Sequence, residues 1–279
     1  MRLLVTGAGG TLGSTLAETA LKAGHEVTAP DRESMDITDA LDVIRAVNAS
    51  EPEAVVNCAA FSDVDAAQAH PREALAVNRD GARNVAKAAA EAGAAFVHIS
   101  TDYVFDGKRE VPYLPQDRPA PLNLYGISKL AGEMAVQESH GEALILRTSW
   151  IFGGHSRGFV AWVSTKLREA GPALQIVEDQ QSRPTWCRDL AQSILALIAL
   201  GATGVHHVAD RGHCTRLELA REVQGILGTT RELLGVPGEE FGAPARRPRY
   251  SVLDLASTEA LLGRDLPYWQ ESLRKYFGE

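Results

Sequence analysis

Tyr125 and Lys129 are spaced four apart in the stretch YGISK and have the side chains needed to deliver a proton during reduction of a ketone. At the start of a helix, this spacing places both side chains on one face. A phenol with its usual pKa of ~10 gives up its proton reluctantly, and a neighbouring ammonium stabilises the phenolate. We therefore predict that Tyr125 donates the proton and that Lys129 lowers its pKa. Without further context, such a pair is more often an exposed packing pair.

A second polar group, Ser100-Thr101-Asp102, ends an apolar stretch. In a parallel sheet, ligands bind at the carboxyl ends of the strands, where these residues would lie. We expect the Thr101 hydroxyl to hydrogen-bond the carbonyl oxygen of the substrate. Thr101, Tyr125 and Lys129 then form the predicted catalytic set.

A glycine-rich segment, GAGGTLG at residues 7–13, follows the first apolar stretch and opens a helix. Glycine lets the backbone turn sharply and approach a pyrophosphate, and the helix N-terminus offers free N–H groups to that anion. Such turns also join strands to helices where no ligand binds. We predict dinucleotide binding at Gly7, Gly10 and Gly13.

Asp31 ends the second expected strand, 18 residues after Gly13. A carboxylate there can bond the ribose hydroxyls of an adenosine and would repel a 2′-phosphate. The adjacent Arg32 can tolerate that phosphate, so NADH is favoured and NADPH stays open. We expect Asp36 and Ile37 near the adenine, although a solvent-exposed loop is an equally good interpretation of Asp36.

Apolar segments alternate with helical segments through the first half of the chain, which indicates a parallel sheet buried on both faces. The expected fold class is α/β, a Rossmann-type doubly wound sheet with a smaller C-terminal lobe. Residues 1–150 would form the NAD(P)-binding domain and 151–279 mainly a substrate-binding lobe, with 186–208 and 245–258 returning to the first domain. Expected strands are 2–6, 26–29, 54–58, 95–100, 143–148 and 205–208, and expected helices are 11–23, 40–48, 74–92, 125–139 and 217–227; 235–249 reads as a loop.

The composition limits the partners. The 279 residues include 45% hydrophobic and 23% charged residues, typical of a protein with a real core. A formal charge of −8 argues against nucleic acid or an anionic membrane surface as the main partner. Cys58, Cys187 and Cys214 lie far apart and form no CxxC pair, which suits a reducing cytosol. We see no signal peptide and expect a cytoplasmic protein.

Several stretches together resemble the dTDP-4-dehydrorhamnose reductase family of the extended short-chain dehydrogenases/reductases. The glycine turn is common to the whole superfamily, whereas STDYVFDG, PLNLYGISKLAGE and RTSW are specific to this branch. The resemblance spans most of the chain and implies reduction of the C4 ketone of a nucleotide-linked deoxysugar by NADPH or NADH. The matching stretches are GAGGTLG (7–13), DIT (36–38), NCAAFSDVDAAQ (57–68), STDYVFDG (100–107), PLNLYGISKLAGE (121–133), RTSWIFG (147–153), SRPTWCRDLA (182–191) and PARRP (244–248).

The resemblance also assigns roles to residues. Asp102 and Trp150 would touch the sugar nucleotide together with Thr101, and Arg246 or Arg247 would meet its diphosphate, a task suited to the planar guanidinium. Core packing is the alternative for Trp150 and a solvent-exposed loop the alternative for the two arginines. On the cofactor side, the implied contacts are Gly10, Thr11 and Leu12 with the pyrophosphate, Asp31 with the ribose, and Ala60, Phe61 and Ser62 beyond the third strand.

The chain departs from the family pattern at several positions on the substrate side. Ser62 and Gln68 stand where relatives commonly carry Thr and Glu, and arginines are frequent around Arg211, Arg216 and Arg221. These changes leave the identity of the sugar open. Some relatives use a divalent metal at a dimer contact; we identify no metal ligands here, and a homodimer rests on the resemblance alone.

Related proteins have functions other than reduction of this sugar. Sugar-nucleotide dehydratases carry a Glu directly after the Thr-Asp pair, where this chain has Tyr103, so dehydration is disfavoured. A 4-epimerase uses the same Tyr and Lys and remains an alternative, as does a reductase of another keto-sugar. A non-catalytic role, like that of the regulatory β subunit of methionine adenosyltransferase, is disfavoured by the complete catalytic set.

Overall fold

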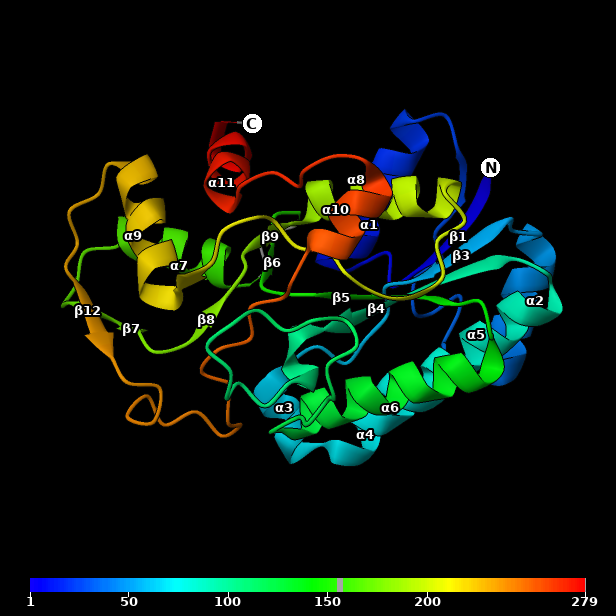
Figure 1. The fold of residues 1–279 in the computed structure, drawn as a ribbon, viewed down its shortest axis with the longest axis horizontal. Coiled ribbons are helices and arrows are strands. Elements are labelled where there is room, and N and C mark those ends of the chain that lie inside the picture. Colours follow the sequence, from blue (N-terminus) through cyan, green and yellow to red (C-terminus); the bar gives the residue numbers. More distant parts are fainter. Residues whose placement is uncertain (155–157, 279) are drawn as a thin grey trace.

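Figure 1 shows the computed structural model, which describes residues 1–154 and 158–278. Its centre is a parallel sheet in the order β10-β5-β4-β3-β1-β2, so the expected doubly wound α/β fold is confirmed. The strand order reverses between β1 and β3, and ligands of such sheets bind at this switch point. The strands are β1 (Arg2–Thr6), β2 (Glu26–Thr28), β3 (Ala54–Asn57), β4 (Ala95–Thr101), β5 (Leu144–Thr148) and β10 (Gly204–His207).

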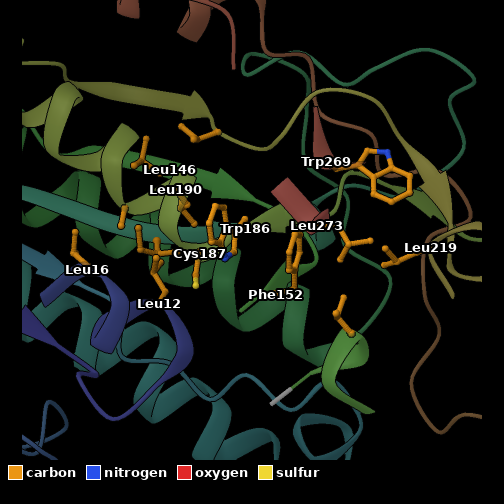
Figure 2. Packing of buried hydrophobic residues seen from close by; sticks show 14 of the residues in the cluster. Leu12, Leu16, Leu146, Phe152, Trp186, Cys187, Leu190, Leu219, Trp269 and Leu273 are labelled. Carbon is orange, nitrogen blue, oxygen red and sulfur yellow. The ribbon is translucent and has the colours of Figure 1, made fainter. Parts of the chain in front are cut away.

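Helices cover both faces of this sheet (Figure 1). On one face, α1 (Thr11–Lys22) and α8 (Cys187–Ala199) contact each other. Their buried leucines, including Leu12, Leu16 and Leu190, pack with Leu146 of the sheet (Figure 2). The other face is covered by α2 (Ala40–Ser50), α5 (Ala82–Glu91) and α6 (Leu124–Ser139). Burial on both faces explains why the strands read as continuous apolar segments.

The expected helix over 74–92 is wrong as a single α-helix. The structure has α4 (Pro71–Leu75), a π-helical turn η1 (Ala76–Gly81) and then α5. The π-turn carries the buried Asn78, whose amide Nδ2 donates to the Ser128 hydroxyl of α6 at 2.8 Å. Single π-turns within helices are frequent at functional sites. Alanine-rich sequence gives no sign of this turn, because its cause lies in bonds to distant segments.

The C-terminal half is divided between the sheet and a separate lobe (Figure 1). The expected strand 205–208 is β10, which pairs with β5, and the expected helix 217–227 is α9 (Arg216–Leu227). In the lobe, α7 (Phe159–Arg168) contacts α9, and β7 (Leu174–Val177) pairs with β12 (Leu233–Val236), so the expected loop at 235–249 begins within a strand. Short elements complete this half: β6 (Ile151–Phe152), β8 (Gln181–Ser182), β9 (Thr185–Trp186), β11 (Cys214–Thr215), α10 (Ala256–Leu262) and α11 (Trp269–Gly278).

The domain boundaries at 150 and 151 remain a prediction. Residues 155–157 and 279 of the expected lobe lie outside the described residues. Among the described helices, none has the length and apolar character needed to cross a membrane.

Candidate active site

The glycine turn between β1 and α1 lies at the switch point of the sheet. Gly7 has φ +67°, and a Cβ on it would lie 2.6 Å from the amide nitrogen of Ala59, just after β3. A Cβ on Gly13 would overlap the carbonyl oxygen of Gly7. Gly10 precedes α1 and offers no side-chain cap, so the first N–H groups of this helix have no side-chain partner at the cap. This end of the helix is suited to hold a pyrophosphate.

The two residues that open α1 differ in what they can offer a cofactor. Thr11 is half-buried at the helix start, whereas the Leu12 side chain is 6% exposed and packs into the core (Figure 2). Leu12 can therefore meet a cofactor only through its backbone.

Asp31 follows β2 and is exposed. Its Oδ1 accepts hydrogen bonds from the hydroxyl and, at 2.9 Å, from the amide nitrogen of Ser34, and these bonds lower the pKa of Asp31. Arg32 is 85% exposed and reaches Asp36 at 4.0 Å. The carboxylate expected to bind ribose is thus ionised and held by a local turn.

Asp36 and Ile37 follow in a second short turn. The Asp36 Oδ1 accepts from the amide and hydroxyl of Thr38 at 2.9 and 2.8 Å, and these bonds lower its pKa. Ile37 is buried, and its carbonyl accepts a hydrogen bond from Nδ2 of Asn84 on α5 at 3.0 Å. The segment expected at the adenine is therefore fixed against the helical layer.

The segment after β3 contains Ala60, Phe61 and Ser62. Ala60 and Ser62 are exposed, and Phe61 is half-buried. Asn78 of the π-turn holds the Phe61 backbone from both sides: its Oδ1 accepts from the Phe61 nitrogen at 2.8 Å, and its Nδ2 donates to the Phe61 oxygen at 3.1 Å. Asn78, which sequence reasoning missed, thereby shapes the predicted cofactor wall.

The structure brings the predicted catalytic residues together. Thr101 ends β4, and Tyr125 lies in the first turn of α6, where Asn123 caps the helix through a 2.8 Å bond from the Gly126 nitrogen. The Thr101 hydroxyl faces Tyr125 closely enough to lower the pKa of its phenol. Lys129 is one turn further along α6, is 2% exposed, and donates from Nζ to the Ile99 oxygen at 2.6 Å.

Burial controls the pKa values of this pair. It raises the pKa of Tyr125, and the Thr101 hydrogen bond offsets part of that rise. Burial lowers the pKa of Lys129 to about 8, while Coulomb attraction from Glu133 acts the other way. Lys129 is not among the groups that shift the pKa of Tyr125 here, and its ammonium donates to the Ile99 oxygen, so the expected lowering by Lys129 stays a prediction.

A buried ion pair lies one turn beyond Lys129. Glu133 and Arg147 are 3% and 4% exposed and form a two-bond pair, with distances of 2.9 Å from Nε and 2.7 Å from Nη2. Ser100 donates a further bond to Glu133. Pairing of this kind satisfies charges that burial would otherwise make costly.

Asp102 occupies a different environment from the expected one. Its carboxylate is 2% exposed and accepts from the hydroxyls of Thr101 at 3.1 Å, Ser182 at 2.9 Å and Ser251. Burial raises the pKa of Asp102 to about 6 against these lowering bonds. In this structure the carboxylate holds Thr101, and its expected contact with the sugar stays a prediction.

A cleft of about 750 Å³ opens beside the catalytic residues. Tyr103 lies at its inner wall, with its ring centroid 6.0 Å from that of Tyr125. The lobe contributes Phe159, Trp162 and Arg216 to the lining. The cleft therefore extends from Tyr103, the neighbour of the predicted proton donor, to the lobe.

Trp150 is half-buried directly after β5 and has φ +44°, a strained backbone for a bulky residue. The guanidinium of Arg216 lies 3.6 Å from the centroid of its ring. Core packing explains part of its position, since Trp150 also contacts the main core.

The two predicted diphosphate arginines have different surroundings. Arg247 lines the cleft and forms a two-bond pair with Asp65 of α3 (Val64–Ala69), at 2.7 and 2.6 Å. The Arg246 side chain is exposed, and its backbone oxygen accepts from Asn123 at 2.7 Å. Arg247 is therefore better placed than Arg246 to bind a diphosphate in the cleft, but it is already paired with the Asp65 carboxylate.

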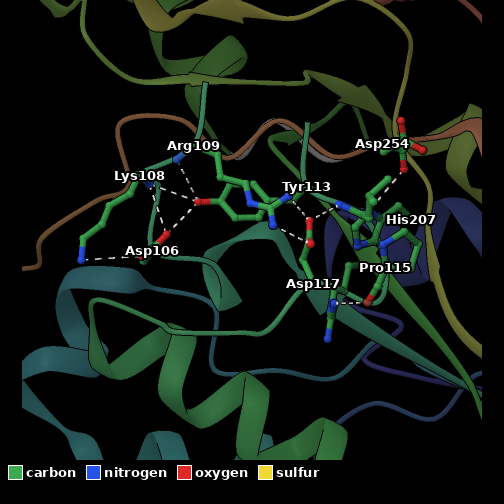
Figure 3. Close-up of polar contacts among 10 residues, drawn as sticks. Asp106, Lys108, Arg109, Tyr113, Pro115, Asp117, His207 and Asp254 are labelled. Atoms are coloured by element: carbon green, nitrogen blue, oxygen red, sulfur yellow. Dashed lines mark hydrogen bonds and ion pairs between the residues drawn. The ribbon is translucent and has the colours of Figure 1, made fainter. Parts of the chain in front are cut away.

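The rim of the cleft at Asp106 and Lys108 is fixed by Tyr113 (Figure 3). The Tyr113 hydroxyl donates to Asp106 at 2.8 Å and accepts from the Lys108 nitrogen at 3.1 Å. Arg109 forms a two-bond pair with Asp117 alongside. This segment therefore presents a rigid edge to the cleft.

Comparison with known proteins identifies the family of this chain. The model of the RmlD substrate binding domain family matches residues 1–279. The chain belongs to this family.

Members of the RmlD family and solved structures match over nearly the whole chain. The chain is 39% identical over 280 residues to dTDP-4-dehydrorhamnose reductase of Mycobacterium tuberculosis strain H37Rv, covering 98% of this chain and 91% of the relative. It is 37% identical over 278 residues to dTDP-4-keto-6-deoxy-D-glucose reductase of Streptomyces niveus, covering 99% and 96%. A structure of dTDP-4-dehydrorhamnose reductase from Bacillus anthracis in complex with NADP superposes with a TM-score of 0.95 at 37% identity, covering 99% and 98%.

Several residues of the site were not predicted from the family's sequence motifs. Arg216 was noted only as a departure from the family pattern, and the sequence around Ser251 gives no sign of its bond to Asp102. Gln68, the other departure, has its own contact: its Oε1 accepts from the Leu124 nitrogen at the start of α6, at 3.3 Å. Within residues 1–154 and 158–278, no group of three or more His, Cys, Asp or Glu side chains could hold a metal ion.

Proposed function

We propose that this chain uses NADPH or NADH to reduce the C4 ketone of a nucleotide-linked deoxysugar, converting dTDP-4-dehydro-L-rhamnose to dTDP-L-rhamnose. The convergence of Thr101 at the end of β4 with Tyr125 and Lys129 of α6, next to the cleft residue Tyr103, carries this proposal. The relatives named dTDP-4-dehydrorhamnose reductase support the substrate, and the NADP complex of the Bacillus anthracis enzyme supports the cofactor.

The residues of this chain suit that reaction. The glycine turn and the open N-terminus of α1 fit the cofactor, which supplies the hydride when bound. Thr101 orients the carbonyl oxygen, and Tyr125 transfers its phenolic proton to that oxygen as the alkoxide charge develops. Lys129 provides a donor for the cofactor ribose and a positive charge on the helix face of Tyr125. The fixed position of Thr101 keeps the oxygen aligned with the donor.

A second candidate is the same reduction on dTDP-4-keto-6-deoxy-D-glucose. The Streptomyces niveus relative, at 37% identity, favours it. Both candidates place a C4 ketone against Tyr125, so they differ only in the contacts that the sugar ring makes.

The cellular setting is proposed on composition. We infer a cytoplasmic protein whose partner is a nucleotide sugar rather than nucleic acid or membrane, and we keep a homodimer open. The net charge of −8 and the three free cysteines support this setting.

The deciding experiment follows oxidation of NADPH and NADH by the purified chain with each keto-sugar nucleotide, alongside Tyr125→Phe. Loss of the general acid should lower kcat by at least about 10²-fold while NADPH still binds. Tyr268→Phe, a change at a 51% exposed ring outside the cleft, is the matched control. Formation of dTDP-L-rhamnose identifies the first substrate.

Two results would contradict the proposal. Wild-type protein that binds NADPH but oxidises it with neither sugar would remove the reductase function. Full activity in Tyr125→Phe would remove Tyr125 from the mechanism and leave the reaction to another acid.

A further inference from the structure

Arg216 begins α9 and brings a guanidinium to the inner part of the cleft. Its Cζ lies 3.6 Å from the ring centroid of Trp150 and 4.9 Å from that of Phe159. Tyr103, which lines the same cleft, interacts with it electrostatically. Stacking on two aromatic rings fixes the plane of the guanidinium and leaves its edge as the part that can donate hydrogen bonds.

The other basic side chains around the cleft are mostly paired. Arg247 binds Asp65 at 2.6 Å, and Arg249 reaches Asp179 at 3.5 Å. Lys108 is 81% exposed and lies 3.7 Å from Asp106. These pairs reduce the positive charge that each residue offers to a ligand.

Arg216 differs from them. In the part of the chain that the structure describes, no carboxylate oxygen is found within 4.0 Å of its nitrogens. Asp102 attracts it by Coulomb interaction, but that carboxylate is occupied by three hydroxyls. Burial lowers the pKa of Arg216, which shows that the charge is costly in this position. A half-buried cation without an ion pair is suited to receive oxygen atoms of a ligand.

The position of Arg216 indicates which part of the ligand supplies the oxygen atoms that it binds. Tyr103, which lines the cleft together with Arg216, is two residues from Thr101, and the Tyr103 ring packs edge-on to Tyr125. The reacting carbonyl of the sugar must lie against Thr101 and Tyr125. A donor in contact with Tyr103 is therefore near the sugar ring.

We propose that Arg216 is a specificity-determining residue that donates hydrogen bonds to oxygens on the sugar ring of the substrate. The inference rests on the proposed function, because that function places the sugar between Tyr125 and the lobe. The Trp150 ring stacks on the guanidinium and fixes its position in the cleft, and the Trp150 backbone is strained at φ +44°. Arg216 thus binds the sugar ring, whereas the nucleotide and diphosphate bind further along the cleft.

The test compares binding of dTDP and dTDP-L-rhamnose to wild-type protein and to Arg216→Gln by isothermal titration. Saturating NADPH is present, with which the product cannot react. We expect dTDP affinity within twofold of wild type and dTDP-L-rhamnose affinity lower by about tenfold, the order expected for a hydrogen bond to a charged group. The advantage that the sugar gives over dTDP alone should be lost.

Arg221→Gln is the matched control, since Arg221 is exposed on the same helix and outside the lining of the cleft. It should bind both ligands as wild type does. Arg216→Lys keeps a cation over Trp150 but lacks the planar donors, so it repeats the test if glutamine destabilises the fold.

Each contrary result has a distinct meaning. An equal loss of affinity for both ligands would place Arg216 at the diphosphate and overturn the proposal. Unchanged binding of both, or an equal loss in Arg221→Gln, would also overturn it. Binding is measured without turnover, so these results are separate from a failure of the wild-type protein to reduce the keto-sugar.

Discussion

The Thr101 hydroxyl is held by two hydrogen bonds before any substrate arrives. It donates to the Asp102 carboxylate at 3.1 Å and accepts from the Tyr103 nitrogen at 3.2 Å. Asp102 is in turn bonded by Ser182 and by Ser251. A hydroxyl positioned in this way loses little freedom on binding. Its single proton points to Asp102, so Thr101 must exchange that bond to donate to a carbonyl oxygen.

Asp102→Asn should change the pH dependence of stability. The folded-state pKa of about 6 lies above the usual aspartate pKa of 3.8, so ionisation destabilises the folded protein. Stability from this group is therefore gained as pH falls through 6 towards 4. Between pH 7 and pH 4, the wild-type free energy of unfolding should gain about 2 kcal/mol relative to Asp102→Asn.

Urea unfolding at several pH values measures this difference, and subtracting the variant cancels the other carboxylates. A difference that stays flat or shrinks on acidification would show that the three hydroxyls keep Asp102 ionised well below pH 6.

At the scale of the elements, the turn from β1 to α1 has no room for a side chain at Gly7 or Gly13. Gly13→Ala places a methyl group against the Gly7 carbonyl oxygen, so backbone must move. We expect NADPH affinity to fall at least about tenfold and the melting temperature to drop, since overpacking typically costs about 1–3 kcal/mol. Fluorescence titration and thermal melts measure both effects.

Gly9→Ala is the control for the glycine turn, because a Cβ there meets nothing within 4 Å. It should bind NADPH nearly as wild type does. Equal weakening in both variants would mean that chain flexibility, rather than close packing, is what the turn needs.

Local patterns in the sequence were enough to predict most elements of the sheet and to select Thr101, Tyr125 and Lys129, which the structure brings together. The helix carrying Tyr125 and Lys129 was placed within one residue of α6, because its capping and spacing are local. The π-turn was missed, since Asn78 is defined by its bonds to Phe61 and Ser128. Contacts of this kind join segments far apart in the chain and leave no periodic trace.

For the same reason, the sequence did not predict the surroundings of Asp102. Asp102 was expected to contact sugar, but its partners Ser182 and Ser251 are 80 and 149 residues away. Burial of that carboxylate follows from tertiary packing, which a single motif does not encode.

At the scale of the whole molecule, Asp65 ties the first half of the chain to the loop that lines the cleft. It binds Arg247 through two bonds and accepts from the Ala245 nitrogen at 3.0 Å. Asp65→Asn should loosen this loop and raise KM for the sugar nucleotide at least about fivefold, with kcat and KM for NADPH nearly unchanged, because charge-assisted pairs are the stronger ones.

Steady-state kinetics with each substrate varied in turn measures this split. Asp42→Asn, which removes an exposed pair with Arg45, is the control and should leave both KM values unchanged. A lower KM in Asp65→Asn would show instead that Asp65 competes with the substrate for Arg247.

The late position of β10 in the chain has a consequence for synthesis on the ribosome. β5 (Leu144–Thr148) can complete its pairing only when residues 204–207 have been made, about 60 residues later. Until then a nascent chain displays the open edge of an apolar strand, the kind of edge that invites pairing with other chains. The same interval leaves α1 without α8. Chaperone dependence and inclusion-body formation should therefore concentrate in truncations that end between β5 and β10.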